Sequence, residues 1–147
     1  MSNSFHLALP AGDIEKTEKF YTDILGCKTG NREKGKWVDI DFWGNELTLH
    51  QTKMKLPRER HNVDMGNVPV PHFGVHLEPE VFAKLKERLA EHKIEYIDPP
   101  YLRFEGQLGE QRTMFIKDPS DNHIEFKSFR NIDLVFASDL DEKIVEN

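Results

Sequence analysis

Apolar and polar residues alternate in short stretches along the chain, as they do in strands that bury one face. The first stretch, residues 5–9, is followed by a turn and then by Asp13, a residue type favoured at helix N-caps. Apolar residues recur at helical spacing as far as Leu25, and Gly26 favours the end of this helix. Two further strands are predicted at residues 36–42 and 46–51.

The same order of elements occurs a second time. The second copy begins with alternating residues 71–77 and continues, from Pro79, into an amphipathic helix. Its remaining strands are predicted at residues 94–97, 112–117 and 123–129, with a turn-forming sequence at residues 118–122 between the last two. A repeat of this kind predicts an α+β fold built from two βαβββ modules.

The chain is predicted to form a single domain of 147 residues. Its parts are a first module at 5–52, a linker at 53–70, a second module at 71–129 and a C-terminal tail at 130–147. Prolines at 57, 69 and 71 mark the linker. A domain of this length buries enough surface to fold without a metal ion, so any metal that it binds is expected to serve chemistry.

Charge and hydropathy exclude several classes of partner. A net charge of −6 disfavours nucleic acid, whose binding depends on clustered Lys and Arg. The apolar runs are only a few residues long, far short of the roughly 20 that cross a bilayer, and no signal peptide is apparent at the N-terminus. The chain is therefore expected to be cytoplasmic, and its one cysteine, Cys27, cannot form an internal disulfide bridge.

Histidine and glutamate side chains gather on the polar faces of four predicted strands. Alternation places them on the side away from the core, at His6, Glu46, His50, His72, His76, His123 and Glu125. Two imidazoles and a carboxylate suit Fe(II), Zn(II), Mn(II) or Ni(II). His6 and His72 occupy the same place in the two copies, each seven residues before the start of a helix. The repeat therefore makes this pair the first candidates for metal ligands.

Distances along a strand limit which residues can share one ion. Residues four apart on a strand are about 13 Å apart, whereas two ligands of one ion are about 3 Å apart. His72 and His76 are thus alternatives, and the repeat favours His72. Glu46 and His50 are alternatives in the same way. The imidazole of His50 is the better ligand of the two, but the sequence does not fix the register of this strand against its neighbours.

Three motifs together resemble the vicinal oxygen chelate superfamily, which includes glyoxalase, extradiol dioxygenases, fosfomycin-resistance proteins and bleomycin-binding proteins. The first comprises His6-Leu7-Ala8-Leu9-Pro10, Phe20-Tyr21 and Leu25-Gly26; the others are His72-Phe73-Gly74-Val75 and Asp118-Pro119-Ser120-Asp121-Asn122 followed by Ile124-Glu125-Phe126. The likeness covers residues 5–129. It implies that the two modules form a cupped mixed sheet with helices on the outer face, and that the chain forms a homodimer.

The resemblance also implies a ligand set of His6, His72 and Glu125 around one divalent ion. Spacing alone does not choose between His123 and Glu125, which are about 6.6 Å apart on one strand, and the resemblance selects Glu125. His50 stands where glyoxalase has a Glu that binds the ion and abstracts a proton. His50 is therefore a candidate fourth ligand, and a strict glyoxalase mechanism is not implied.

Candidate catalytic residues are Glu125 and His76, the latter because an imidazole with a pKa near 6.5 suits a general base. Substrate contacts are predicted in the glycine-containing loop from Arg103 to Gln111, with Arg103 suited to an anionic group. Both Arg103 and Gln111 are candidate substrate-binding residues.

These observations predict a metal-dependent enzyme of the glyoxalase or dioxygenase type, either a lyase or isomerase or a dioxygenase. Its substrate would chelate the ion through two neighbouring oxygens. An alternative is a non-catalytic protein of the bleomycin-resistance type that sequesters a drug or antibiotic, and a third hypothesis is a structural protein with surface histidines. Metal content separates them, because only the enzyme needs the convergent histidines.

Overall fold

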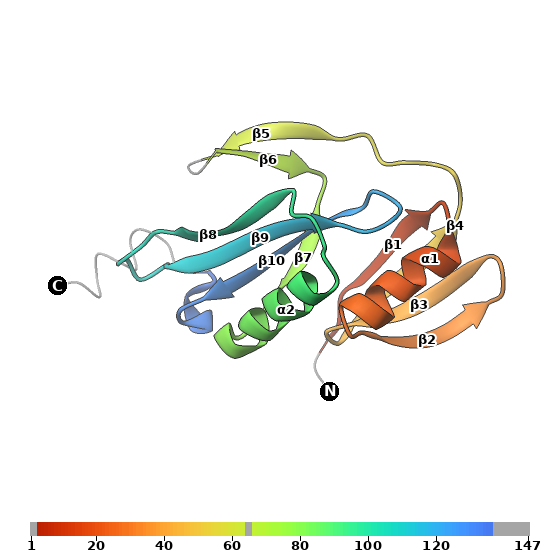
Figure 1. Ribbon diagram of the computed structural model, residues 1–147, viewed down its shortest axis with the longest axis horizontal. Helices are drawn as coiled ribbons and strands as arrows, with labels where there is room; N and C mark the ends of the chain where they lie inside the picture. Colours follow the sequence, from red (N-terminus) through yellow and green to blue (C-terminus); the bar gives the residue numbers. More distant parts are fainter. Residues whose placement is uncertain (1–2, 64–65, 137–147) are drawn as a thin grey trace.

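The computed structural model describes residues 3–63 and 66–136. Two βαβββ modules follow one another along the chain (Figure 1), as the repeat predicts. The first comprises β1 (His6–Ala11), α1 (Ile14–Lys19), a π-helical turn η1 (Phe20–Ile24), β2 (Lys28–Glu33), β3 (Trp37–Phe42) and β4 (Asn45–Gln51). Its sheet has the order β1-β4-β3-β2, in which β1 and β4 are parallel.

The second module repeats this topology. It comprises β7 (Phe73–His76), α2 (Pro79–Glu91), β8 (Asp98–Arg103), β9 (Gln111–Lys117) and β10 (His123–Phe129), and a short helix η2 (Ile132–Leu134) follows it. The sheet order is β7-β10-β9-β8, with β7 and β10 parallel. The predicted fold class, α+β with two βαβββ modules, is confirmed; within one chain the modules form two separate four-stranded sheets.

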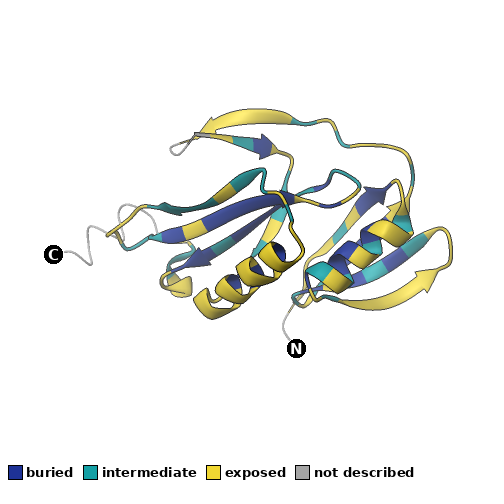
Figure 2. Cartoon of the chain, in the orientation of Figure 1, coloured by how far each residue is buried: buried dark blue, intermediate teal, exposed yellow. Residues whose placement is uncertain are grey.

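A single hydrophobic core joins the modules. In each sheet the apolar face packs against a helix, and Figure 2 shows buried residues, in dark blue, on both helices and on the strands beside them. The ring of Phe42 in β3 contacts the rings of Phe73 and Phe126 in the second module, at centroid distances of 5.4 and 6.3 Å. The polar faces of both sheets are thereby turned away from the core, and the candidate ligands lie on these polar faces.

A buried polar contact also connects the modules. The hydroxyl of Tyr21, which is fully buried, donates a hydrogen bond of 2.8 Å to Oδ2 of Asp118 in the β9–β10 turn. The other carboxylate oxygen of Asp118 accepts from the backbone N–H groups of Ser120 and Asn122. The turn sequence that the pattern singled out therefore holds the first helix against the second sheet.

Three segments differ from the sequence prediction. Strand β2 was not predicted, because its residues are all exposed and carry no apolar alternation. The strand predicted at 94–97 is replaced by β8 at Asp98–Arg103, which contains Pro99 and Pro100. The predicted linker contains an antiparallel hairpin of β5 (Glu59–Val63) and β6 (Gly66–Val70).

Part of the predicted C-terminal tail, residues 137–147, lies outside the described residues. Within the described part of the chain, no helix is both long and apolar enough to span a membrane.

Candidate metal and substrate site

His72 and Glu125 are brought together at the parallel junction of β7 and β10. The Nε2 atom of His72 is 3.3 Å from Oε1 of Glu125. The Nδ1 atom of the same ring is 2.5 Å from the carbonyl oxygen of Pro69, and the hydroxyl of Thr113 in β9 donates to Oε2 of Glu125. Both side chains are therefore held in fixed orientations by groups behind them.

The pKa values of this pair move in opposite directions. The hydrogen bond with Glu125 raises the pKa of His72, and this effect exceeds the opposing effect of burial. Burial disfavours the ionised form of Glu125, but hydrogen bonds from His72 and Thr113, with Lys127 nearby, hold its pKa below the usual value. When no cation is bound, the contact thus favours the protonated form of His72 and the ionised form of Glu125.

Gly74 allows the two strands to approach at this point. In the register of the parallel strands it lies opposite Glu125, and a Cβ atom at position 74 would be 1.5 Å from the carbonyl oxygen of Glu125. No side chain fits in that space. The glycine of the His72-Phe73-Gly74-Val75 motif is therefore needed to place His72 beside Glu125.

A hollow of about 280 Å³ covers this part of the sheet, and His72, His76, Glu125 and Lys127 contribute to its lining. Lys127 is opposite His76 in the register, with its Nζ 3.7 Å from Oε1 of Glu125. Burial, aided by Lys127, lowers the pKa of His76, so its ring is neutral at pH 7. The edge of this ring meets the ring of Phe129 at a centroid distance of 5.3 Å.

His6 lies on the polar face of the first sheet, next to Glu46. Its Nδ1 atom is 2.7 Å from Oε1 of Glu46, and the two residues are directly opposite in the register of β1 and β4. His50 lies opposite Pro10, four residues further along, beside Trp37 of β3. The register that the sequence left open therefore places Glu46, and not His50, beside His6.

Within one chain the predicted ligands gather only in part. His72 and Glu125 are in contact, while His6 contacts Glu46 on a separate sheet. Among residues 3–63 and 66–136, His, Cys, Asp and Glu side chains form no group of three or more that could hold a metal ion. A single chain thus does not bring His6 to His72 and Glu125, and the assignment of these residues as ligands stays a prediction.

The candidate substrate residues Arg103 and Gln111 are cross-strand neighbours on the face that carries Glu125. Gln111 is opposite both Arg103 and Phe129 in the register, and it shares its face of β9 with Thr113. Its side chain is 7% exposed and its Nε2 donates to the carbonyl of Gly109. Oε1 of Gln111 has no hydrogen-bond partner in the described part of the chain.

His123, the alternative to Glu125, is occupied by other contacts. Its Nε2 is 3.4 Å from Oδ1 of Asp121, and burial together with nearby Arg58 lowers its pKa. Sequence reasoning did not single out Thr113 or Lys127. Strand alternation places Lys127 on the face of Glu125, but Thr113 becomes recognisable only through the pairing of β9 with β10.

Comparison with known proteins agrees with this fold. Residues 4–126 match the model of the Glyoxalase/Bleomycin resistance protein/Dioxygenase superfamily, and the chain belongs to that family. A glyoxalase/bleomycin resistance protein/dioxygenase structure from Alicyclobacillus acidocaldarius superposes with a TM-score of 0.76 at 32% identity, covering 92% of this chain and 97% of that one.

More distant relatives have different names. The glyoxalase domain-containing protein RDO1 of Mycosarcoma maydis is 26% identical over 126 residues, which are 86% of this chain and 68% of the relative. The fosfomycin resistance protein FosX of Listeria monocytogenes superposes with a TM-score of 0.68 at 16% identity, covering 90% and 97% of the two chains. This last likeness concerns the fold alone.

Proposed function

We propose that the protein is a divalent-metal-dependent enzyme of the glyoxalase or dioxygenase type. Its substrate is a small molecule that chelates the ion through two neighbouring oxygens, and its working form is a cytoplasmic homodimer. His72 and Glu125 supply two ligands from one chain. The ion, when bound, supplies Lewis-acid catalysis by polarising the substrate oxygens.

The contact between His72 and Glu125 carries this proposal. Nδ1 of His72 donates to the carbonyl of Pro69, so a neutral ring would present an unprotonated Nε2 to the carboxylate. Two atoms that both carry lone pairs and face each other at 3.3 Å need a cation between or beside them, and the raised pKa of His72 reflects this need. A divalent ion of the imidazole- and carboxylate-binding class suits the same donor set.

The groups behind these two ligands have the pattern found around metal sites. A ligating His usually donates its other ring N–H to a carbonyl or carboxylate, and a ligating carboxylate is itself hydrogen-bonded. Pro69 and Thr113 meet both conditions here. They fix the ring tautomer and the carboxylate orientation before any ion arrives.

We further propose that the third ligand is His6 from a second copy of the chain. His6 and Glu46 lie on an exposed face of the first sheet, and His72 and Glu125 lie in a hollow of the second. In a two-fold symmetric dimer, the exposed face of the first sheet of one copy would lie over the hollow of the second sheet of the other copy. This arrangement would complete two identical sites. Glu46, in contact with His6, would then be positioned to exchange a proton beside the ion.

Metal analysis tests this proposal. The purified protein, loaded with Mn²⁺, Zn²⁺, Ni²⁺ or anaerobic Fe²⁺ and then dialysed, should retain about one ion per chain of its preferred metal. His6→Ala, His72→Ala and Glu125→Gln should each weaken metal binding about tenfold or more, since each removes a ligand. His92→Ala, in an exposed residue at the end of α2, is the control and should bind as the wild type does.

Substrate class is tested with the loaded protein. Fosfomycin, hemithioacetals of glutathione and catechols represent chemistries of the family, and turnover of one class that is lost in His72→Ala would support an enzyme. Tight binding of bleomycin with no metal retained would instead support the sequestering function. Unchanged metal content in His6→Ala and His72→Ala would contradict the proposed site.

A further inference from the structure

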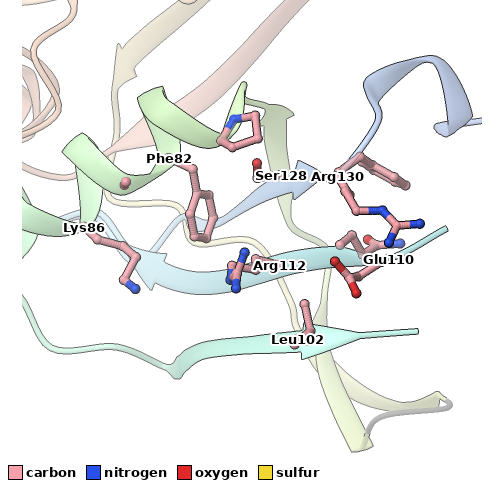
Figure 3. A pocket seen from close by; sticks show the side chains of 11 residues that line it. Phe82, Lys86, Leu102, Glu110, Arg112, Ser128 and Arg130 are labelled. Carbon is pink, nitrogen blue, oxygen red and sulfur yellow. The ribbon is translucent and has the colours of Figure 1, made fainter. Parts of the chain in front are cut away.

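A second hollow lies on the opposite side of the second sheet, between α2 and strands β8, β9 and β10 (Figure 3). Its volume is about 410 Å³. Arg112 and Ser128 face into it, and each alternates along its strand with residues of the other face, such as Thr113 and Lys127. This hollow is therefore separated from the His72–Glu125 contact by the thickness of the sheet.

Cationic side chains predominate around the hollow. Lys86 reaches towards it from α2 and Arg112 from β9 (Figure 3), and within the described part of the chain neither side chain has an ion pair or hydrogen-bond partner. Arg130 at one end donates to the carbonyl of Gln107. The carboxylate of Glu110 lies at the same end and accepts from the N–H of Gly106.

The chain carries a net charge of −6, yet three cationic residues, Lys86, Arg112 and Arg130, line this hollow beside one carboxylate, that of Glu110. Unpaired positive charges repel each other, and an anion between them would remove that repulsion. The charge of the hollow thus fits an anionic ligand.

A serine hydroxyl and an apolar floor add to this charge. Ser128 is 5% exposed, its hydroxyl has no hydrogen-bond partner among the described residues, and Figure 3 shows its oxygen turned into the hollow. The ring of Phe82, 2% exposed, descends from α2 beside it, and Leu102 of β8 lies on the other side of Arg112. An anion in the hollow would supply the hydrogen-bond partner that this hydroxyl lacks among the described residues.

We propose that this hollow is a binding site for a small organic anion. Lys86, Arg112 and the hydroxyl of Ser128 bind its phosphate or carboxylate group, since guanidinium and ammonium groups recognise both. Its apolar body packs against Phe82 and Leu102. The site is distinct from the proposed metal site and does not depend on metal binding.

Amide NMR titration of the metal-free, full-length protein tests the proposal. The probes are phenyl phosphate, phenylacetate, inorganic phosphate and benzyl alcohol. Phenyl phosphate or phenylacetate should shift the amide signals of Phe82, Arg112 and Ser128, and comparison of the two identifies the preferred anion. Inorganic phosphate and benzyl alcohol each lack one half of the recognised chemistry and should bind at least about tenfold more weakly.

Variants separate this site from general attraction to cations. Arg112→Gln should raise the Kd of the better probe about tenfold, and Ser128→Ala should raise it several-fold. Lys34→Gln, in an exposed turn of the first module, removes the same charge elsewhere and should leave the Kd unchanged. Equal weakening by Lys34→Gln and Arg112→Gln would overturn the proposal, as would signal shifts confined to His76 and Lys127 on the other face.

Discussion

The Nε2 atom of His72 lies 3.3 Å from Oε1 of Glu125, and this contact links β7 to β10. The hydrogen bond raises the pKa of His72 above its ordinary value of 6.5 in the metal-free protein. In Glu125→Gln the carboxylate charge is lost, so the pKa of His72 should fall. NMR titration of the ring protons of His72 measures this directly, and an unchanged His72 pKa in Glu125→Gln would show that the two groups do not interact in solution.

The same contact should make stability depend on pH in a defined window. Because the folded-state pKa of His72 is raised, its stabilisation is present below about pH 6.5 and is lost as pH rises through the folded value. Because the folded-state pKa of Glu125 is lowered, its stabilisation is present above about pH 4.5 and is lost as pH falls through the folded value. The interaction should therefore be strongest between these limits.

A double-mutant cycle measures that interaction. His72→Gln, Glu125→Gln and the double variant are compared with the wild type by urea unfolding of metal-free protein from pH 4 to pH 9. The coupling free energy should be about 1 kcal/mol or more near pH 5.5 and should decrease towards both ends. A coupling free energy that does not vary with pH would contradict an ionised pair.

Strand alternation alone does not select the candidate ligands. It places His72, His123 and Glu125 on polar faces, and the repeat favours His72 over His76, which lies about 13 Å further along the strand. The choice of Glu125 over His123 comes from the family resemblance. Alternation does not determine the register of paired strands, because it assigns each residue to a face without fixing which residues are opposite each other. For that reason Glu46, the actual neighbour of His6, was ranked behind His50.

The missed strands have a related physical cause. Strand β2 has the sequence Lys-Thr-Gly-Asn-Arg-Glu, so it carries no buried face that a pattern could reveal. Strand β8 contains Pro99 and Pro100, which usually argue against a strand, but it pairs on one side only, at the edge of its sheet. Pairing with a neighbouring strand determines both elements, and a local pattern does not contain that information.

Tyr21 should contribute to stability through its bond to Asp118. In Tyr21→Phe a buried carboxylate loses a donor, which should lower the free energy of unfolding by about 1–3 kcal/mol. Thermal or urea unfolding measures the loss. Tyr96→Phe, at a half-buried tyrosine of the second module, is the control and should change stability by less than about 0.5 kcal/mol; equal effects of the two substitutions would exclude a specific role for the Tyr21 contact.

Gly74→Ala should be among the most damaging small substitutions. The added Cβ would meet the carbonyl oxygen of Glu125 at 1.5 Å, so β7 must move away from β10. We expect a loss of about 3 kcal/mol or more in the free energy of unfolding, or failure to fold. Gly12→Ala is the matched control, because its nearest contact would be 3.9 Å from the new Cβ; comparable stability of the two variants in urea unfolding would contradict the close approach of the strands.

Complementation between chains provides the sharpest test of a site shared by two copies. Chains carrying His6→Ala and chains carrying Glu125→Gln are co-expressed with different affinity tags, and the mixed dimer is purified through both tags. If His6 of one copy serves Glu125 of the other, one of the two sites contains only wild-type ligands, while the second carries both substitutions. Metal content should then recover to roughly half the wild-type value, as two-fold symmetry requires.

If both ligands came from the same chain, each site of the mixed dimer would carry one defect and no recovery would occur. Dimers homogeneous for either substitution are the controls, and both should remain without tightly bound metal. Because His6 and Glu125 lie on separate sheets of one chain, a mixed dimer as deficient in metal as these controls would show that the second copy does not supply the third ligand.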